Sequence, residues 1–328
     1  MRPTETRIPA KGVRSLAWDD DALVDWVGGG QRYRLQGEML PQLVRYAYGF
    51  DAVASLAGSA FSVIYTRCGT KGLVLQDGKV VREINRSYYH ADLYEYPIAL
   101  LRQPSGRVLL AHCPRAYCRL DIEDVLTGEL LTDTVPREPG DVFHSRLAAS
   151  ADGRYLLSAG WVWHPAEEVC VYDVVSALAD PAHLDGQGIG AFEGAAQSSA
   201  AFFPDGRWAI AMKGDVFAGE DDGPLEHGEL RIHDPRRPTT PIVIGGVGSL
   251  GRIAAIGNHH VLALHGHPRL IHVPTGTEVL AWPHLDSGNQ VSAIVAPDTV
   301  LPMIAIDSAG QRFALADAEG ITVVQLHG

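Results

Sequence analysis

The sequence has little that would place it in a membrane or an oxidising compartment. Only 4 of its 328 residues are cysteine, too few for a fold that depends on disulfides. No uninterrupted apolar run reaches the ~18 residues that a membrane-spanning helix needs. The N-terminal stretch MRPTETRIPAKG also lacks the apolar core of a secretory signal. We therefore expect a cytoplasmic protein that has no membrane as a partner.

The chain also lacks an excess of positive charge. Lys and Arg number 27 against 39 Asp and Glu, which gives a net charge of −12. Nucleic-acid backbones are bound through basic patches, so the composition argues against a nucleic-acid partner. Several catalytic and phosphate-binding signatures are missing as well, including Gly-x-Ser-x-Gly, His-Glu-x-x-His and the phosphate-binding loop. The sequence therefore names no reaction.

What the sequence does have is a long-period repeat. Glycines in similar hairpin contexts recur at intervals of 48, 47, 53, 51 and 53 residues, at Gly58, Gly106, Gly153, Gly206, Gly257 and Gly310. They lie between short runs rich in Val, Ile, Leu, Tyr and Phe, as expected for tight turns between strands. Such turns need a residue that tolerates positive φ. A strand meander repeated at this spacing is typical of a β-propeller.

The sequence thus predicts an all-β fold, a single closed β-propeller over residues 1–328. We expect seven blades of four antiparallel strands, within a range of six to eight, starting near residues 13, 50, 92, 145, 196, 250 and 290. In the last blade the expected strands are 291–294, 303–306, 312–315 and 321–325. The N-terminal run Thr6–Ile8 is expected to pair with that blade and close the ring, which removes exposed sheet edges. Residues 174–191 are expected to include a short helical excursion.

Three turns of the form Ser/Asp-Gly-Arg lie at 104–107, 151–154 and 204–207, and Tyr172-Asp173 and His233-Asp234 lie at strand ends. In these features the chain resembles WD-repeat and related propeller proteins, over nearly all of its length. The Trp-Asp dipeptide is absent from those strand ends, so the resemblance is architectural and does not transfer the family's buried polar network. It implies a rigid platform for macromolecular partners.

A meandering blade sends its connections to two opposite faces. Minimal turns form one face, the short-turn face, whereas the loops between blades and between second and third strands form the other, the long-loop face. Four loops of the long-loop face, at 87–96, 112–117, 140–146 and 160–168, are rich in Tyr, Trp, His and Arg. We expect them to form one contiguous surface that binds a partner. The candidate binding residues are Tyr88, Tyr89, His90, Asp92, Tyr94, Glu95, Arg115, Tyr117, His144, Arg146, Trp161, Trp163 and His164. The alternative is that the aromatic side chains plug the mouth of the central channel.

The function that these observations favour is a non-catalytic interaction module with a protein partner. The alternative is a hydrolase or lyase with a histidine and carboxylate cluster at the channel mouth, drawn from His90, His112, His144, His164, His265 and His284. We expect no metal and no cofactor. Cys113 and Cys118 lack a complete ligand set, and the acidic loop 219–229 lacks the spacing of a calcium-binding EF-hand loop.

Overall fold

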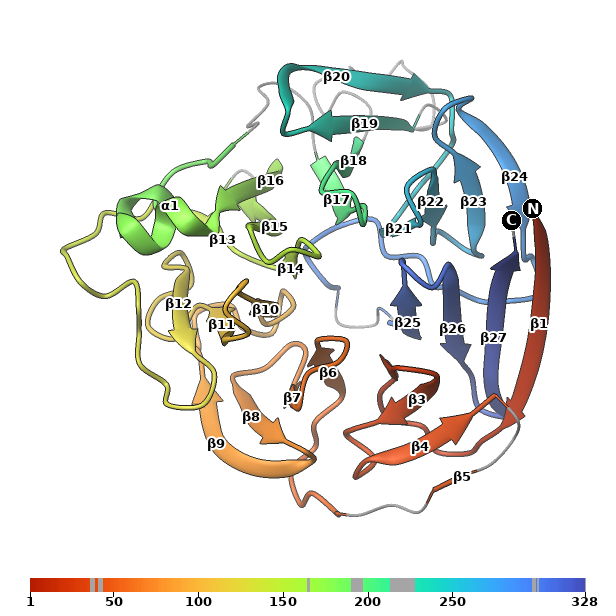
Figure 1. The fold of residues 1–328 in the computed structure, drawn as a ribbon, viewed down its shortest axis with the longest axis horizontal. Helices are drawn as coiled ribbons and strands as arrows, with labels where there is room; N and C mark the ends of the chain where they lie inside the picture. Colours follow the sequence, from red (N-terminus) through yellow and green to blue (C-terminus); the bar gives the residue numbers. More distant parts are fainter. Residues whose placement is uncertain are drawn as a thin grey trace.

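A computed structural model of the protein describes residues 1–35, 39–40, 44–163, 166–189, 197–212, 228–296, 299 and 301–327. Seven antiparallel sheets stand around a central axis (Figure 1). The architecture is therefore a seven-bladed β-propeller, and the predicted fold class is confirmed. In the described residues, no helix is long and apolar enough to cross a membrane.

The strands of the first three blades, from the axis outward, are β2 (Ala17–Asp19), β3 (Ala22–Asp25), β4 (Gln31–Arg34) and β5 (Met39–Leu40); β6 (Ala52–Ser55), β7 (Phe61–Tyr65), β8 (Lys71–Gln76) and β9 (Lys79–Asn85); and β10 (Ile98–Arg102), β11 (Val108–His112) and β12 (Asp121–Asp124). The fourth blade contains β13 (Val142–Phe143), β14 (Ala148–Ala149), β15 (Tyr155–Val162) and β16 (Ala166–Asp173). The last three blades are β17 (Gln197–Phe202), β18 (Trp208–Met212), β19 (Glu229–Asp234) and β20 (Arg237–Gly245); β21 (Ile253–Ile256), β22 (His260–Ala263), β23 (Arg269–His272) and β24 (Thr277–Ala281); and β25 (Met303–Asp307), β26 (Arg312–Ala316), β27 (Gly320–His327) and β1 (Arg2–Pro9).

The N-terminal strand β1 forms the outer edge of the seventh blade. It pairs antiparallel with β27 along its whole length, from Arg2 opposite His327 to Pro9 opposite Gly320, and the two strands lie side by side at the rim of the ring (Figure 1). Ile8 is buried, so β1 adds apolar contacts as well as backbone hydrogen bonds. The seventh sheet thereby obtains four strands from the two ends of the chain.

The expected strand at 291–294 is wrong, because β1 already completes the seventh sheet. Residues 287–296, here called the crossing segment, belong to the connection from the sixth blade to the seventh and pass over the middle of the ring (Figure 1). The Ala293 N–H donates to Glu167 at 2.6 Å, and the Val295 N–H donates to the carbonyl of Leu93 at 2.7 Å. The segment therefore contacts the third and fourth blades before it returns to β25.

The fourth blade departs most from a regular meander. Its innermost strand is split into β13 and β14, which both pair with β15. Between them, Arg146 has a φ of 45°, a left-handed conformation that costs energy for a residue other than glycine. On the outer side of β16 the chain forms α1 (Val174–Ala179) and the 3₁₀ helix η1 (Pro181–Leu184), which agrees with the predicted helical excursion. The Asp173 side chain caps α1 by accepting the Ser176 N–H.

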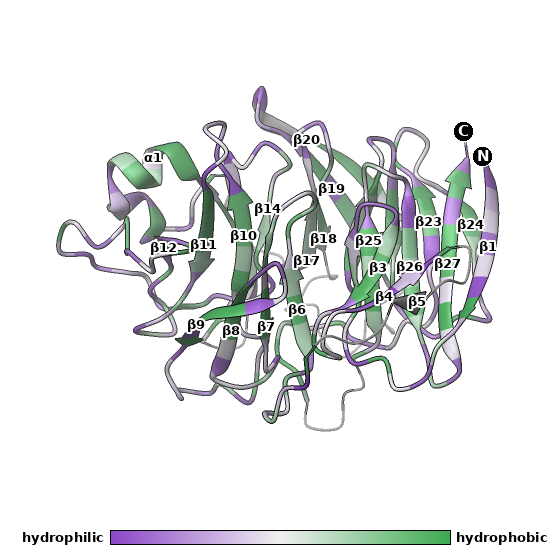
Figure 2. Ribbon diagram, turned by 60° about the horizontal axis from the view of Figure 1, so that its bottom comes forward, coloured by the Kyte–Doolittle hydropathy of each residue, from purple (hydrophilic) through white to green (hydrophobic). Residues whose placement is uncertain are grey.

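Hydrophobic clusters lie at each of the seven interfaces between neighbouring blades. Val63 and Leu110 belong to one that joins the second and third blades, and Leu230 and Val261 belong to another that joins the fifth and sixth. Figure 2 shows hydrophobic residues concentrated along the strands. An eighth cluster, around Phe143, lies among the loops rather than between two sheets. This arrangement fixes the blades rigidly and leaves the loop faces for other roles.

Turn geometry agrees with the predicted hairpins at five of the six repeat glycines, whereas at the sixth, Gly310, the positive φ of 51° belongs to the next residue, Gln311. Gly153 and Gly206 have φ values of 67° and 86°, as the turns require. The two sites differ in their surroundings, because a Cβ atom at position 153 would overlap the carbonyl oxygen of Arg102, whereas one at position 206 would meet no atom within 4 Å.

Candidate functional site

The four aromatic loops meet on the long-loop face around the ring of Phe143. That ring stacks on Trp161 at 3.9 Å between centroids and an interplanar angle of 6°, and on Tyr117 at 4.3 Å and 27°. Tyr89 and Trp163 approach from the two neighbouring loops, at 6.0 and 5.3 Å. The Phe143 cluster is defined by these rings together with two more, and consists of Tyr89, His90, Tyr94, Tyr117, Phe143, Trp161 and Trp163. The loops thus form one contiguous group, as expected.

The Phe143 cluster has a buried base and an exposed rim. Phe143, Tyr94 and Trp161 are at most 3 % exposed, whereas Tyr89 is 47 % and Trp163 41 % exposed. Tyr88, next in the chain to Tyr89, is 84 % exposed. The ring stacking of the base therefore holds large aromatic side chains at the surface, where water surrounds them.

Several predicted contact residues are buried, so the expectation that their side chains touch a partner is wrong. Tyr94 lies under the guanidinium of Arg86, 4.4 Å from its ring, and pairs with Ile294 of the crossing segment. His144 places Nδ1 3.0 Å from the Ser158 hydroxyl, and burial lowers the pKa of its imidazole to about 4. Trp161 is buried beneath Phe143. These three side chains are packed inside the protein, and none of them lines the cavity on the axis of the ring.

The remaining predicted residues of this surface are accessible. His90 and Tyr117 are half-buried, and Asp92 is exposed. The Tyr117 hydroxyl donates to Asp141, and burial together with this bond raises the pKa of the phenol. Arg115 is exposed but forms a two-point ion pair with Asp133. His164 lies outside the described residues.

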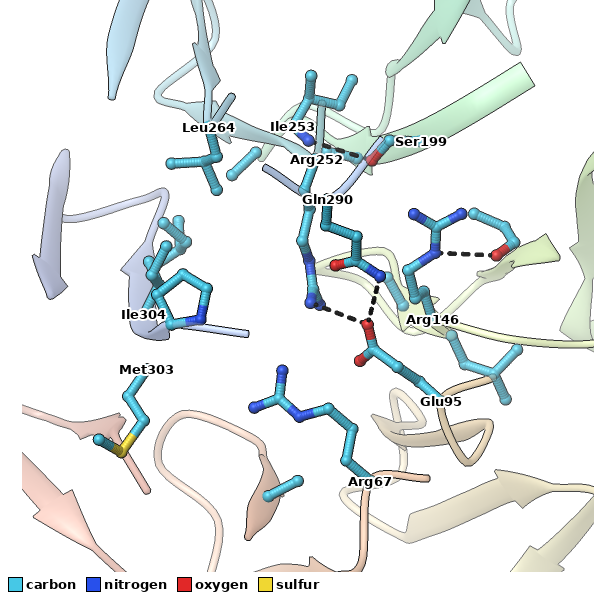
Figure 3. Close-up of a pocket in the computed structure, with 18 of the residues that line it drawn as sticks. Arg67, Glu95, Arg146, Ser199, Arg252, Ile253, Leu264, Gln290, Met303 and Ile304 are labelled. Carbon is cyan, nitrogen blue, oxygen red and sulfur yellow. Dashed lines mark hydrogen bonds and ion pairs between the residues drawn. The ribbon is translucent and has the colours of Figure 1, made fainter. Parts of the chain in front are cut away.

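Two predicted residues, Glu95 and Arg146, line a different feature, a cavity of about 350 Å³ along the axis of the ring. Arg67, Arg252 and Gln290 line it as well (Figure 3). Burial alone would raise the pKa of Glu95, but the positive charges of Arg252, Arg67 and Arg146 lower it below its ordinary value.

Sequence reasoning missed Arg67, Arg252 and Gln290. Part of this charged lining could have been found in the sequence, because several of its residues lie one to three positions before an innermost strand. Glu95 precedes β10, Arg146 precedes β14 and Arg252 precedes β21. Innermost strands of all blades start at the same end of the channel, so these side chains face a common space. Phe143 was also missed as the centre of the aromatic cluster.

Three of the described histidines proposed for a catalytic cluster lie in separate environments. His112 is buried 3.2 Å from Glu123 within the third blade, and His284 pairs with Glu5 at 2.9 Å near the outer edge of the ring. His144 binds Ser158, as described above. Among the residues that the structure describes, no three His, Cys, Asp or Glu side chains are grouped to hold a metal ion. The acidic loop at 219–229 lies outside the described residues except for Gly228 and Glu229.

No protein-family model matches the sequence, and no curated protein matches it. The fold is similar to the β-propeller domain of Cps50 (Swd1) from Myceliophteria thermophila, with a TM-score of 0.60 and 11 % identity over 99 % of this chain and 100 % of that one. This likeness confirms the β-propeller architecture. At this identity it concerns the fold alone.

Proposed function

We propose that the protein is a non-catalytic interaction module, one propeller domain over residues 1–328, that binds a protein partner through the exposed rim of the Phe143 cluster. The observation that carries the proposal is the exposure of Tyr88, Tyr89 and Trp163 above a buried base of stacked rings. Tyr and Trp dominate the energetic centres of protein interfaces. A propeller fold is compatible with an interaction role in general, but a fold hosts many functions, so the proposal rests on this surface.

The base of the cluster makes the rim suitable for binding. Trp163 lies 5.3 Å from the rings of both Phe143 and Trp161, nearly perpendicular to each. Tyr89 lies 4.8 Å from Tyr117. Rings held in this way have few conformations left to lose, so a partner gains contact area at a small entropic cost.

The charges around the rim indicate a partner with basic side chains. Asp92 and Asp141 are exposed carboxylates in the same loops, whereas the positive charge of Arg115 is compensated by Asp133. The whole chain carries a net charge of −12. Lys or Arg side chains of a partner would find both carboxylates and aromatic faces, with which cations interact favourably. The same charges argue against nucleic acid or an anionic membrane as the partner.

The experiment is a pull-down from native lysate with immobilised wild-type protein and two variants. Trp163→Ala removes a rim side chain. Arg154→Ala changes an exposed side chain on the short-turn face, which forms an ion pair with Asp173 and lies over the Tyr155 ring. We expect a protein that is retained by the wild type and by Arg154→Ala but not by Trp163→Ala. With that protein purified, calorimetry should show about 2 kcal/mol weaker binding to Trp163→Ala, roughly a 30-fold increase in Kd.

Circular dichroism and the melting temperature of each variant serve as the folding control. The proposal fails if all three proteins retain the same set of lysate proteins. It fails equally if Trp163→Ala binds the purified partner with unchanged affinity.

A further inference from the structure

The cavity on the ring axis gathers arginines from three blades that are not neighbours. Arg67 belongs to the loop between β7 and β8 in the second blade, Arg146 lies between β13 and β14 in the fourth, and Arg252 directly precedes β21 in the sixth. In Figure 3, Arg252 reaches the Glu95 carboxylate, the Arg67 guanidinium extends into the same open space, and Arg146 lies beside Gln290. Three separate blades therefore supply guanidinium groups to one space.

These guanidinium groups have hydrogen-bonding capacity left over. Glu95 Oε1 lies 3.4 Å from Arg252 Nη1 and 3.3 Å from Gln290 Nε2, both long for hydrogen bonds that involve a charge. Arg146 donates through Nε to the Ala159 carbonyl at 3.1 Å, but its buried Nη2 has no acceptor. In the described part of the chain, the Arg67 guanidinium also meets no acceptor, and only its backbone N–H bonds to Asp51. Buried donors are normally satisfied, so the free Nη2 of Arg146 calls for an explanation.

The charges of the lining do not cancel. Three arginines face two carboxylates, Glu95 and Asp51, so the lining has a surplus of positive charge within a protein whose net charge is −12. Burial lowers the pKa of the Arg146 guanidinium to about 10, which means that its charge is held at an energetic cost. A negative charge placed in the cavity would offset that cost.

The backbone at Arg146 is strained in a way that keeps its side chain in place. Its φ of 45° interrupts the innermost strand of the fourth blade. Such conformations persist only where the surrounding structure enforces them, and they concentrate at ligand sites. The split between β13 and β14 therefore fixes the direction of this arginine.

We propose that this cavity binds a small oxyanion, a phosphate- or carboxylate-bearing molecule, through Arg67, Arg146 and Arg252. Guanidinium groups pair with both kinds of anion through parallel hydrogen bonds. A volume of about 350 Å³ is at the lower end of the range for small-molecule sites. Solvent reaches the arginines, because 43 % of the Arg252 side chain is accessible. This site does not depend on the protein partner proposed above, and it uses none of the exposed rim residues.

The test is calorimetric titration of the full chain with inorganic phosphate and with citrate, at constant ionic strength, with chloride as the non-chelating anion. We expect phosphate, citrate or both to bind saturably, and chloride not to bind. Whichever of phosphate and citrate binds more tightly identifies the anionic group that the cavity prefers. Arg67→Gln and Arg146→Gln should each weaken that binding at least tenfold. Arg154→Gln, on the short-turn face, should leave it unchanged.

Glu95→Gln is the more discriminating variant, because it removes the carboxylate that competes with an added anion for the arginines. We expect it to tighten anion binding at least threefold, whereas arginines that merely hold Glu95 in place would give no gain. If Arg146→Gln does not fold, Arg67→Gln and Glu95→Gln decide the question. The proposal is overturned if neither anion binds saturably, or if Arg67→Gln binds as tightly as the wild type.

Discussion

Phe143→Leu is expected to damage the partner-binding surface without changing any residue that a partner touches. Phe143 is fully buried, yet its ring stacks on Trp161 and Tyr117 at 3.9 and 4.3 Å. Leucine keeps most of the apolar volume but removes the flat ring. Tyr89 and Trp163 would then lose the support that orients them, and partner binding should weaken.

The stability cost follows from the same contacts. A hydrophobic exchange of similar size costs less than about 1.5 kcal/mol, and each well-placed ring pair adds about 0.5–1.5 kcal/mol beyond its buried area. With two stacked pairs lost, the free energy of unfolding should fall by about 1–4.5 kcal/mol by the same reasoning.

Phe313→Leu is the matched control. Phe313 is also fully buried, but it lies between the sixth and seventh blades, where one ring of the described residues, that of Trp282, lies beside it at 5.1 Å. It should cost less, and partner binding should stay unchanged. Urea unfolding measures the stability, and near-ultraviolet circular dichroism reports the packing of the rings. Equal stability costs in the two variants, with an unchanged near-ultraviolet spectrum for Phe143→Leu, would refute the stacking argument.

Three further predictions concern the scaffold. Gly153→Ala and Gly206→Ala both place a side chain at positive φ, which costs about 1–2 kcal/mol, but only the Cβ atom at position 153 also meets the Arg102 carbonyl. The urea midpoint of Gly153→Ala should therefore be the lower of the two, and equal midpoints would contradict this prediction. Deletion of residues 1–9 removes β1, exposes the edge of β27 and should lower the melting temperature and promote aggregation; an unchanged melting curve would count against the role of β1 in closing the ring. Burial lowers the pKa of His144 in the folded state to about 4. As the pH falls below about 6.5, the unfolded chain therefore takes up a proton at this imidazole before the folded chain does, so the folded state should lose stability down to about pH 4. In urea titrations between pH 6.5 and 5, His144→Gln should reduce that loss by about 1.5 kcal/mol, and an unchanged pH dependence would show that His144 is not the group responsible.

The repeat made the blade count predictable from sequence. Turns at Gly58, Gly106 and Gly153 need positive φ, and a glycine marks such a turn whatever the rest of the chain does. The crossing segment was not predictable, because a short apolar run such as 291–294 has the same pattern whether it joins a sheet or bridges two loops.

The candidate site was predictable only in part. The aromatic content of the loops predicted that they form one surface. The sequence of a loop does not distinguish an aromatic side chain that points into the protein from one that points into solvent, so Tyr94 and Trp161 were expected at the surface although they are buried. Arg67 and Arg252 meet Arg146 only because the ring brings distant blades together. The positions of Arg146 and Arg252 just before innermost strands gave a partial signal, whereas Arg67 lies in the loop between β7 and β8 and left no local pattern.

The most direct test of the proposed function is site-specific photo-crosslinking in native lysate. A photo-reactive amino acid in place of Tyr88, the most exposed ring of the surface at 84 %, should give a discrete protein adduct. The same amino acid in place of Arg154, on the short-turn face, should not give that adduct, and Trp163→Ala should reduce the yield from position 88. Absence of any adduct from position 88, or the same adduct from both positions, would contradict an interaction surface built on the Phe143 cluster.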